Sequence, residues 1–309
     1  MNISYIDTEF GKIKYSRVND YIEIIEYTGK DLCLSIPELI DDAPVKVIKK
    51  KAFLSQKFVK EIVLPGFIEV IEDYAFARCS KLTTLYLPYK NIKLGQDILK
   101  DCNQLTFICN SLNVDAINEK DDVAFLLAKT INELNAFFLF DLKNAGTKEW
   151  LMHLDATISM RLEKDDMEDF SKMILCGEEE VVCGEDGTIE DSNPDHYKSN
   201  RVKEKIRIAF LRLLHNYMLD GELEMKLKQY LLDHSKGQKT DETWQVVLNE
   251  HGDERAYYDY LLSIGAINDN NFELILNDMG NRYTEIKSYL IKWKDENSTK
   301  NNMFSEFGL

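Results

Sequence analysis

The sequence of 309 residues predicts an α+β protein: a short repeat solenoid with an N-terminal β-hairpin cap, followed by an all-α helical-hairpin domain. Two observations carry this prediction. A pattern of apolar side chains recurs at a constant spacing before residue 110, and the apolar spacing changes to three and four after residue 120. Acidic and basic side chains balance over residues 1–110, so the whole net charge of −16 lies beyond them. We therefore expect two domains, residues 1–112 and 113–309.

A β-hairpin is predicted at the N-terminus. Residues 12–16 and 21–27 have strand-like side chains on either side of the dipeptide Asn19-Asp20, which favours a turn. An uncovered sheet edge can pair with other chains. We expect the hairpin to cover the open N-terminal end of the solenoid.

The repeat itself is clearest where the segment 47–65 aligns with the segment 70–88, every equivalent pair being 23 apart. A third copy over residues 94–110 keeps the spacing but loses the Ala-Phe pair and the proline. Each copy predicts a short strand, a turn and a segment whose aromatic side chain fills the middle of a coil. One coil cannot bury its own apolar face, so the coils stack, with their strands in a parallel sheet.

A further copy upstream ends in Ile36-Pro37, whose equivalents in the next copy are Leu64-Pro65, so this first spacing is longer than the others. We interpret the five extra residues, around Asp41 to Pro44, as a loop.

Several segments of these copies resemble the BspA-type leucine-rich repeat of many bacterial proteins, over roughly residues 21–110. The segments are Tyr27-Thr28-Gly29-Lys30, Ala52-Phe53, Ala75-Phe76, Cys79 and Leu85 to Pro88. Members of that family are often surface proteins that bind host or matrix proteins, so the resemblance implies a leucine-rich-repeat solenoid with a protein-binding role. Residues 121–295 resemble the helical region that accompanies such repeats in other bacterial proteins, which implies no activity.

Helices are expected from Asp121 onward, where acidic residues stand at a favourable N-terminus and apolar residues recur at helical spacing. The expected segments are 121–138, 150–162, 167–174, 203–218, 223–234, 244–248, 257–264, 273–279 and 283–293. The helix over 203–218 is apolar on much of its circumference, which predicts a central position.

Sequence signals also predict where the C-terminal helices begin and end. Asn270 and Glu273 form a capping-box-like start, and Gly265 and Gly280 end helices. The pairs are loosely ankyrin-like, and residues 296–309 are expected to be a loose tail.

The cysteines and histidines give no catalytic or metal-binding pattern. Cys79 and Cys102 lie 23 apart at equivalent coil positions, which indicates packing under the turn, with an adventitious crosslink as the alternative. Cys176 and Cys183 have no zinc-site spacing and lie in a segment that we interpret as a solvated acidic loop. We expect all six cysteines to be reduced.

The five histidines are scattered, and the catalytic and phosphate-binding motifs H-E-x-x-H, G-x-S-x-G and G-x-x-x-x-G-K-[ST] do not occur. They are His153, His196, His215, His234 and His251. The group His251-Gly252-Asp253 stands at an expected helix junction, which favours a cap. We therefore expect no enzyme, no cofactor and no metal.

The most informative surface is the outward side of the coil strands, which we name the strand face. Its expected members, from the register of the repeats, are Cys33, Ser35, Glu61, Val63, Thr84, Tyr86, Phe107 and Cys109. The candidate protein-binding residues are Glu61, Val63, Thr84, Tyr86 and Phe107. Val63, Tyr86 and Phe107 form an apolar diagonal that is either a binding face or the seat of part of the helical domain; scattered exposure without consequence is the third reading.

Together these patterns predict a non-enzymatic protein-interaction module or scaffold with a protein partner. The net charge of −16 repels phosphate backbones and anionic lipids, so we expect no nucleic acid and no membrane partner. The N-terminus has neither a basic n-region nor an apolar h-region, which predicts a cytoplasmic protein. The alternatives are a surface adhesin and an enzyme with a hidden Cys or His site.

Overall fold

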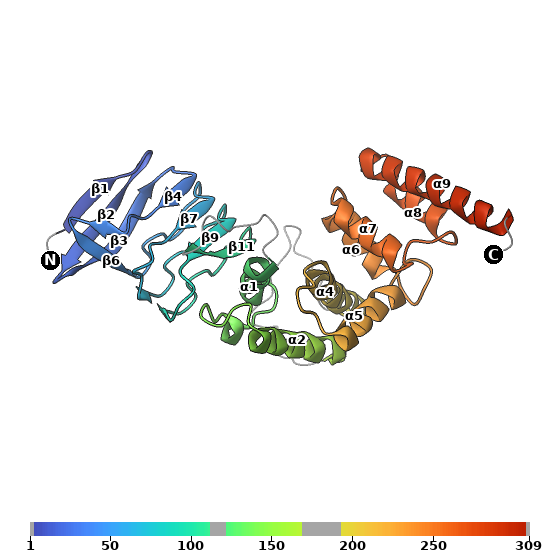
Figure 1. Ribbon diagram of the computed structural model, residues 1–309, viewed down its shortest axis with the longest axis horizontal. Helices are drawn as coiled ribbons and strands as arrows, with labels where there is room; N and C mark the ends of the chain where they lie inside the picture. The colour runs from blue at the N-terminus through green and yellow to red at the C-terminus, as the bar shows by residue number, and fades with distance from the viewer. Residues whose placement is uncertain (1–2, 112–121, 169–192, 307–309) are drawn as a thin grey trace. The chain divides into compact units, whose positions relative to one another are not determined.

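The chain divides into two compact units, Met1–Leu154 and Asp155–Leu309. The structure is a computed structural model, and it describes residues 3–111, 122–168 and 193–306 (Figure 1). The first unit extends past the expected boundary at residue 112. The physical reason is that the first helix of the helical region packs on the last strand of the solenoid.

The first unit contains two sheets. Their strands are β1 (Ile3–Asp7), β2 (Gly11–Val18), β3 (Tyr21–Gly29), β4 (Cys33–Ser35), β5 (Leu39–Ile40), β6 (Ala43–Ile48), β7 (Glu61–Val63), β8 (Val70–Ile71), β9 (Thr84–Leu87), β10 (Lys93–Leu94) and β11 (Phe107–Asn110). One sheet has the order β1-β2-β3-β6-β8-β10, with β5 paired to β6, and the other has the order β11-β9-β7-β4. The second sheet is parallel throughout, as expected for stacked coils.

The interior of the coils is a stack of aromatic rings. The rings of Tyr27 and Phe53 lie 5.9 Å apart, and those of Phe53 and Phe76 lie 5.2 Å apart. Leu99 takes the equivalent place in the third copy and is 2% exposed. The constant spacing of the repeat therefore places one large apolar side chain at the same depth in every coil, which confirms the predicted solenoid.

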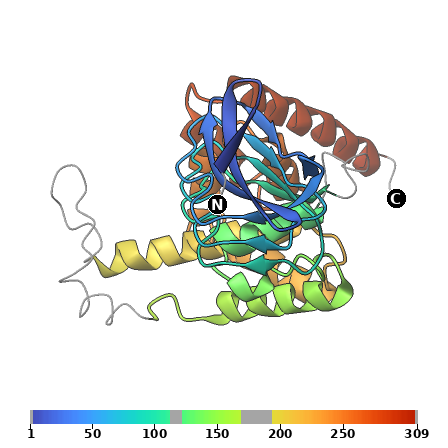
Figure 2. The same cartoon turned by 90° about the vertical axis from the view of Figure 1, so that its left-hand side faces the viewer.

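The predicted N-terminal hairpin is present and larger than expected. Strands β2 and β3 pair antiparallel around Asn19, whose φ is 54°, a left-handed conformation that asparagine tolerates. Strand β1 adds a third strand that the sequence did not predict. Strand β3 pairs parallel with β6, so these strands (dark blue in Figure 2) extend the sheet of the coils at its N-terminal end.

The five extra residues interpreted as a loop form part of a tight hairpin instead. Strands β5 and β6 pair antiparallel, with Leu39 opposite Pro44. The turn between them consists of Asp41 and Asp42, whose φ angles are 49° and 59°. Aspartate adopts this left-handed conformation more readily than most residues, which is why the insertion closes so tightly.

Helix α1 (Asp122–Asn132) and the 3-10 helix η2 (Phe137–Leu139) follow the solenoid in the same unit. The Asn132 side chain donates to the Leu105 carbonyl over 3.0 Å. Helix α2 (Lys148–Glu163) begins in this unit, and its Trp150 indole donates to the Leu139 carbonyl over 2.7 Å. These bonds tie the helices to the last coil and to one another.

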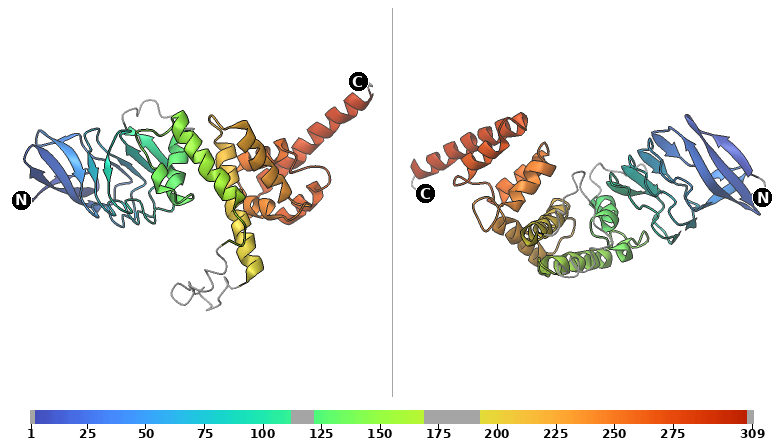
Figure 3. Two further views of the ribbon diagram at one scale, coloured as in Figure 1. Left: turned by 90° about the horizontal axis from the view of Figure 1, so that it is seen from below. Right: turned by 180° about the vertical axis from the view of Figure 1, so that it is seen from behind.

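The second unit is helical in its described residues, as the sequence predicts. Its further helices are α4 (Pro194–Leu214), α5 (Gly221–Asp233), α6 (Glu242–Glu250), α7 (Arg255–Ser263), α8 (Phe272–Met279) and α9 (Thr284–Glu306). Helix α4, yellow in Figure 3, contacts α5, α6 and α7, which confirms the central position expected for residues 203–218. Its Phe210 ring lies 5.0 Å from that of Tyr257 on α7.

Two details of the helical region differ from expectation, and a third expectation lies mostly outside the described residues. The capping box does not form at Asn270, because α8 begins after Asn271, whose side chain donates to the carbonyls of Lys236 and Ala266. The segment 296–306, expected as a loose tail, continues α9. The helix expected over 167–174 lies outside the described residues beyond Glu168, and up to that point the chain forms a turn.

No helix in the described parts of the chain combines the length and the apolar composition that a membrane crossing requires.

Candidate functional site

The register of the coil strands matches the one expected for the strand face. Cys33, Glu61, Thr84 and Phe107 stand opposite one another across the parallel sheet. The next outward row is Ser35, Val63, Tyr86 and Cys109. The intervening row is buried and holds Leu34, Ile62, Leu85 and Ile108. The alternation of a strand thus sends one row into the coil and two rows outward.

Exposure varies along the strand face. Cys33 and Ser35 are exposed, and the five candidate residues Glu61, Val63, Thr84, Tyr86 and Phe107 are half-buried. Cys109 is 3% exposed, so its expected outward position does not give it access to solvent. Strand periodicity reports the direction of a side chain and not what covers it, which is why Cys109 differs.

Helix α1 accounts for part of this gradient. The Phe107 ring meets the Phe125 ring of α1 edge to face, with centroids 6.0 Å apart. The ammonium group of Lys129, also on α1, lies over the Phe125 ring, 5.2 Å from the ring centroid. At the β11 end, the strand face therefore seats a helix of the same unit, while Val63 and Tyr86 lie on β7 and β9.

The strand face has a weakly acidic environment. Burial, together with the negative charge of the Glu61 carboxylate, raises the pKa of the Tyr86 phenol. Burial and the nearby Glu61 carboxylate raise the pKa of the Cys33 thiol. Tyr86 is therefore a neutral hydroxyl at pH 7, beside one acidic side chain, and it offers an aromatic surface with a polar tip.

The other candidate groups have structural surroundings. The buried thiols of Cys79 and Cys102 donate to the carbonyls of Phe53 and Phe76, each over 3.1 Å, so equivalent cysteines make equivalent bonds in successive coils. His251 follows α6 as its C-cap, which confirms its expected place at a helix junction. Its ring stacks on Tyr257 with centroids 3.8 Å apart.

Within the described ranges, no group of three or more His, Cys, Asp or Glu side chains is placed to hold a metal ion. Cys176 and Cys183 lie outside the described residues. On the strand face, the described residues present the half-buried side chains of one aromatic residue, Tyr86, and one aliphatic residue, Val63, beside each other.

Parallel coils with Leu-x-Leu strands and a stacked apolar interior define a leucine-rich-repeat solenoid. Residues 13–135 match the model of the BspA type leucine rich repeat region, with six copies of the repeat. The region is longer than the resemblance over residues 21–110, since it includes most of β2 at one end and α1 at the other.

Three solved structures are similar to 33% of this chain. A leucine rich cell surface protein from Faecalibacterium prausnitzii is 20% identical, matches over 29% of its own chain and has a TM-score of 0.29. A leucine-rich repeat protein from Bacteroides capillosus is 20% identical over 79% of its chain, with a TM-score of 0.29. The T. pallidum leucine rich repeat protein is 24% identical over 59% of its chain, with a TM-score of 0.26. Among curated proteins, the comparison finds no relative.

Proposed function

We propose that this chain is a non-enzymatic protein-interaction module whose strand face binds a protein partner. The observation that carries the proposal is the pairing of Val63 and Tyr86, which stand opposite each other on β7 and β9 and remain half-exposed. Glu61 and Thr84 stand opposite each other two positions earlier and give this apolar pair a polar border. An apolar centre with a polar border is the usual composition of a protein interface.

Rigidity of the sheet supports this role. Each coil strand pairs with the next, and its inward row is buried, so little conformational entropy is lost when a partner binds. Aromatic side chains held in this way are enriched among the residues that dominate binding energy. Phe107 contributes differently, because it packs against Phe125 of α1 and seats the helix beside the exposed part of the face.

The partner that we propose is a protein, and the net charge of −16 disfavours nucleic acid and anionic membranes. We propose a cytoplasmic location, with binding of host or matrix proteins at a cell surface as the alternative. Fractionation of the cells that naturally produce this protein tests its location. Recovery of the protein at the cell surface would favour the adhesin alternative and overturn the cytoplasmic location.

The test of the strand face compares Tyr86→Ala with Phe67→Ala in the full chain. Phe67 is an aromatic residue of the turn after β7 and is 49% exposed. Each variant serves as bait for native host lysate, and a captured protein is then titrated against both. We expect Tyr86→Ala to weaken binding by about 2 kcal/mol, and Phe67→Ala to leave it unchanged.

Thermal melts separate binding from folding. An outward strand side chain contributes at most about 1 kcal/mol to stability through cross-strand pairing, so the Tyr86→Ala melt stays close to wild type. A large fall in melting temperature would assign Tyr86 a structural role instead. Equal binding by wild type and Tyr86→Ala would exclude the strand face as the interface.

A further inference from the structure

The turn side of each coil carries a ladder of backbone hydrogen bonds directed to the next coil. In the first of these turns, the N–H groups of Lys51, Phe53 and Ser55 donate to the carbonyls of Asp73, Ala75 and Ala77, over 3.1, 2.7 and 2.8 Å. One coil later, the N–H groups of Tyr74, Phe76 and Arg78 donate to the carbonyls of Gln96, Ile98 and Lys100, over 2.9, 2.9 and 2.7 Å. In each turn, the donors are every second residue of one coil and the acceptors are every second residue of the next coil.

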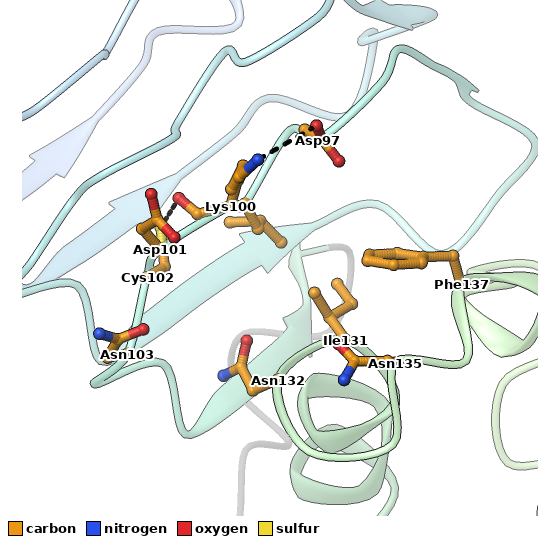
Figure 4. Close-up of a pocket in the computed structure, with 10 residues that line it drawn as sticks. Asp97, Lys100, Asp101, Cys102, Asn103, Ile131, Asn132, Asn135 and Phe137 are labelled. Atoms are coloured by element: carbon orange, nitrogen blue, oxygen red, sulfur yellow. Dashed lines mark hydrogen bonds and ion pairs between the residues drawn. The ribbon is translucent and has the colours of Figure 1, made fainter. Parts of the chain in front are cut away.

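The same positions of the last coil are Asp97, Leu99 and Asp101, and their N–H groups have no acceptor among the described residues. In the described chain, no further coil follows to supply one. A pocket of about 380 Å³ lies against this turn (Figure 4). Its far side consists of residues at and after the end of α1, namely Ile131, Asn132, Asn135 and Phe137. The pocket therefore adjoins the open end of the ladder.

We propose that a peptide segment of a partner protein docks in this pocket and continues the ladder. Its carbonyl oxygens accept hydrogen bonds from the N–H groups of Asp97 and Asp101, whose residues have accessible surface, whereas Leu99 between them is buried. This inference rests on the proposed function, because it supplies a second contact for a protein-binding chain. It describes strand-like addition of a peptide to an open backbone edge, in which main-chain bonds hold the peptide and neighbouring side chains select it.

The charges around the pocket favour a peptide over an anion. The three N–H groups at the end of the ladder could also attract a phosphate or a carboxylate. The side chains of Asp97 and Asp101 stand beside them, however, and repel negative charge. A peptide carbonyl is a neutral acceptor and avoids this repulsion.

The side chains of the pocket also indicate which peptide fits. Lys100 is separated from Asp97 by 4.0 Å, a long pair that an incoming basic side chain can displace. Phe137 is 58% exposed and adds an aromatic wall opposite the Asp97 turn. The lining holds two carboxylates and one ammonium group, and Asp101 also pairs with Arg78 over 3.4 Å. The pocket therefore suits a segment that carries an apolar residue and is neutral, or basic only beside Asp97.

Two pairs of variants isolate the pocket. Phe137→Ala removes the aromatic wall, and Phe138→Ala is its control, since Phe138 is adjacent, 74% exposed and not part of the pocket lining. Asn103→Trp adds bulk at the pocket, and Gln104→Trp adds the same bulk at the neighbouring exposed position outside the lining. All four side chains are exposed, so melts of each variant are expected to match wild type.

The probe is a phage-displayed library of short random peptides, selected on the full chain. We expect enriched peptides whose dissociation constant rises at least about tenfold with Phe137→Ala and with Asn103→Trp, the loss of one well-packed contact. The two control variants should stay within about twofold. Enrichment of no peptide, or equal binding to pocket variants and controls, would overturn the inference.

Hydrogen exchange followed by NMR provides a readout at the ladder itself. In the free chain, the amides of Asp97 and Asp101 should exchange much faster than those of Tyr74 and Phe76, which are bonded. A selected peptide should slow the first set only. Peptides that leave these amides fast, and lose binding with Tyr86→Ala instead, would overturn the pocket inference while supporting the proposed function. Failure at both surfaces would overturn both.

Discussion

The guanidinium group of Arg212 is fully buried and donates to both carboxylate oxygens of Asp155, over 2.6 and 3.2 Å. Asp155 lies on α2 and Arg212 in the last turn of α4, so the pair joins two helices. The same guanidinium also donates to the carbonyls of His215 and Tyr217, which follow α4. A single buried cation thus organises both a helix contact and the turn that leads into α5.

This pair gives the first prediction. Removing one partner of a buried ion pair leaves an uncompensated charge, so Asp155→Asn should lower the free energy of unfolding by about 3 kcal/mol. The control is Glu250→Gln, which breaks the half-exposed pair of Glu250 with Arg207 and should cost less than about 1 kcal/mol. Urea denaturation of the full chain measures both. Similar losses in the two variants would contradict the prediction.

The second prediction concerns pH and Asp31, which is 3% exposed. Burial acts to raise the pKa of this carboxyl, but hydrogen bonds from Thr8, Tyr27 and the Phe10 N–H outweigh it and hold the pKa below its ordinary value. A carboxyl with a lowered pKa in the folded state stabilises the fold at neutral pH. That contribution is lost as the pH falls through the folded-state pKa.

The midpoints of urea unfolding, measured between pH 7 and pH 3, test whether stability falls with pH as expected. Wild type should lose stability below about pH 4, where the unfolded state takes up the proton first. Asp31→Asn should be less stable at pH 7 and should show a smaller loss on acidification. Asp7→Asn, at an exposed carboxyl paired loosely with Lys12 over 3.5 Å, serves as the control. Parallel pH profiles for wild type and Asp31→Asn would refute the assignment.

The third prediction addresses the aromatic stack inside the coils. Phe76 is fully buried and stacks on Phe53, so Phe76→Ala should destabilise the fold by about 3 to 5 kcal/mol. Phe76→Leu should cost less than about 2 kcal/mol, because leucine already occupies the equivalent position at Leu99. Phe58→Ala, at a position 45% exposed, should change little. Thermal or urea unfolding measures the loss of stability, which should be largest for Phe76→Ala, smaller for Phe76→Leu and smallest for Phe58→Ala. A different order would contradict the packing that we describe for the repeat.

The fourth prediction concerns thiol reactivity. Cys33 is exposed, whereas Cys79, Cys102 and Cys109 are buried, and none of these four forms a disulfide. A hydrogen bond with Cys102, together with burial, raises the pKa of the Cys79 thiol and disfavours the reactive thiolate. A thiol reagent should therefore label Cys33 quickly in the folded chain, and the three buried cysteines only after denaturation.

A count of thiols under denaturing, non-reducing conditions extends this test to the whole chain. We expect all six cysteines, including Cys176 and Cys183, to react. A reproducible loss of two thiols would show that a pair had oxidised, with Cys79 and Cys102 as one candidate pair.

The sequence alone determined the solenoid and its register. The constant repeat spacing makes Glu61, Thr84 and Phe107 equivalent, and a slip by a single position would turn the inward row outward. The outward direction of the strand-face residues follows from that constraint. Helical spacing likewise predicted the central position of α4, because a helix apolar around much of its circumference must be covered on several sides.

Only the tertiary structure decided which of these groups are covered and which remain open. Phe107 meets Phe125, and Cys109 is buried, through contacts that no local pattern encodes. Asn270 does not begin the helix as expected, because α8 starts after Asn271, whose side chain donates to the carbonyl of Lys236, distant in sequence. The open ladder at Asp97, Leu99 and Asp101 arises because repeats end where the chain changes period, while the packing of the following helix sets the space beyond them. The periodicity of the sequence determines which way a side chain points within a strand or helix. The packing of one element on another determines whether that side chain is exposed to solvent.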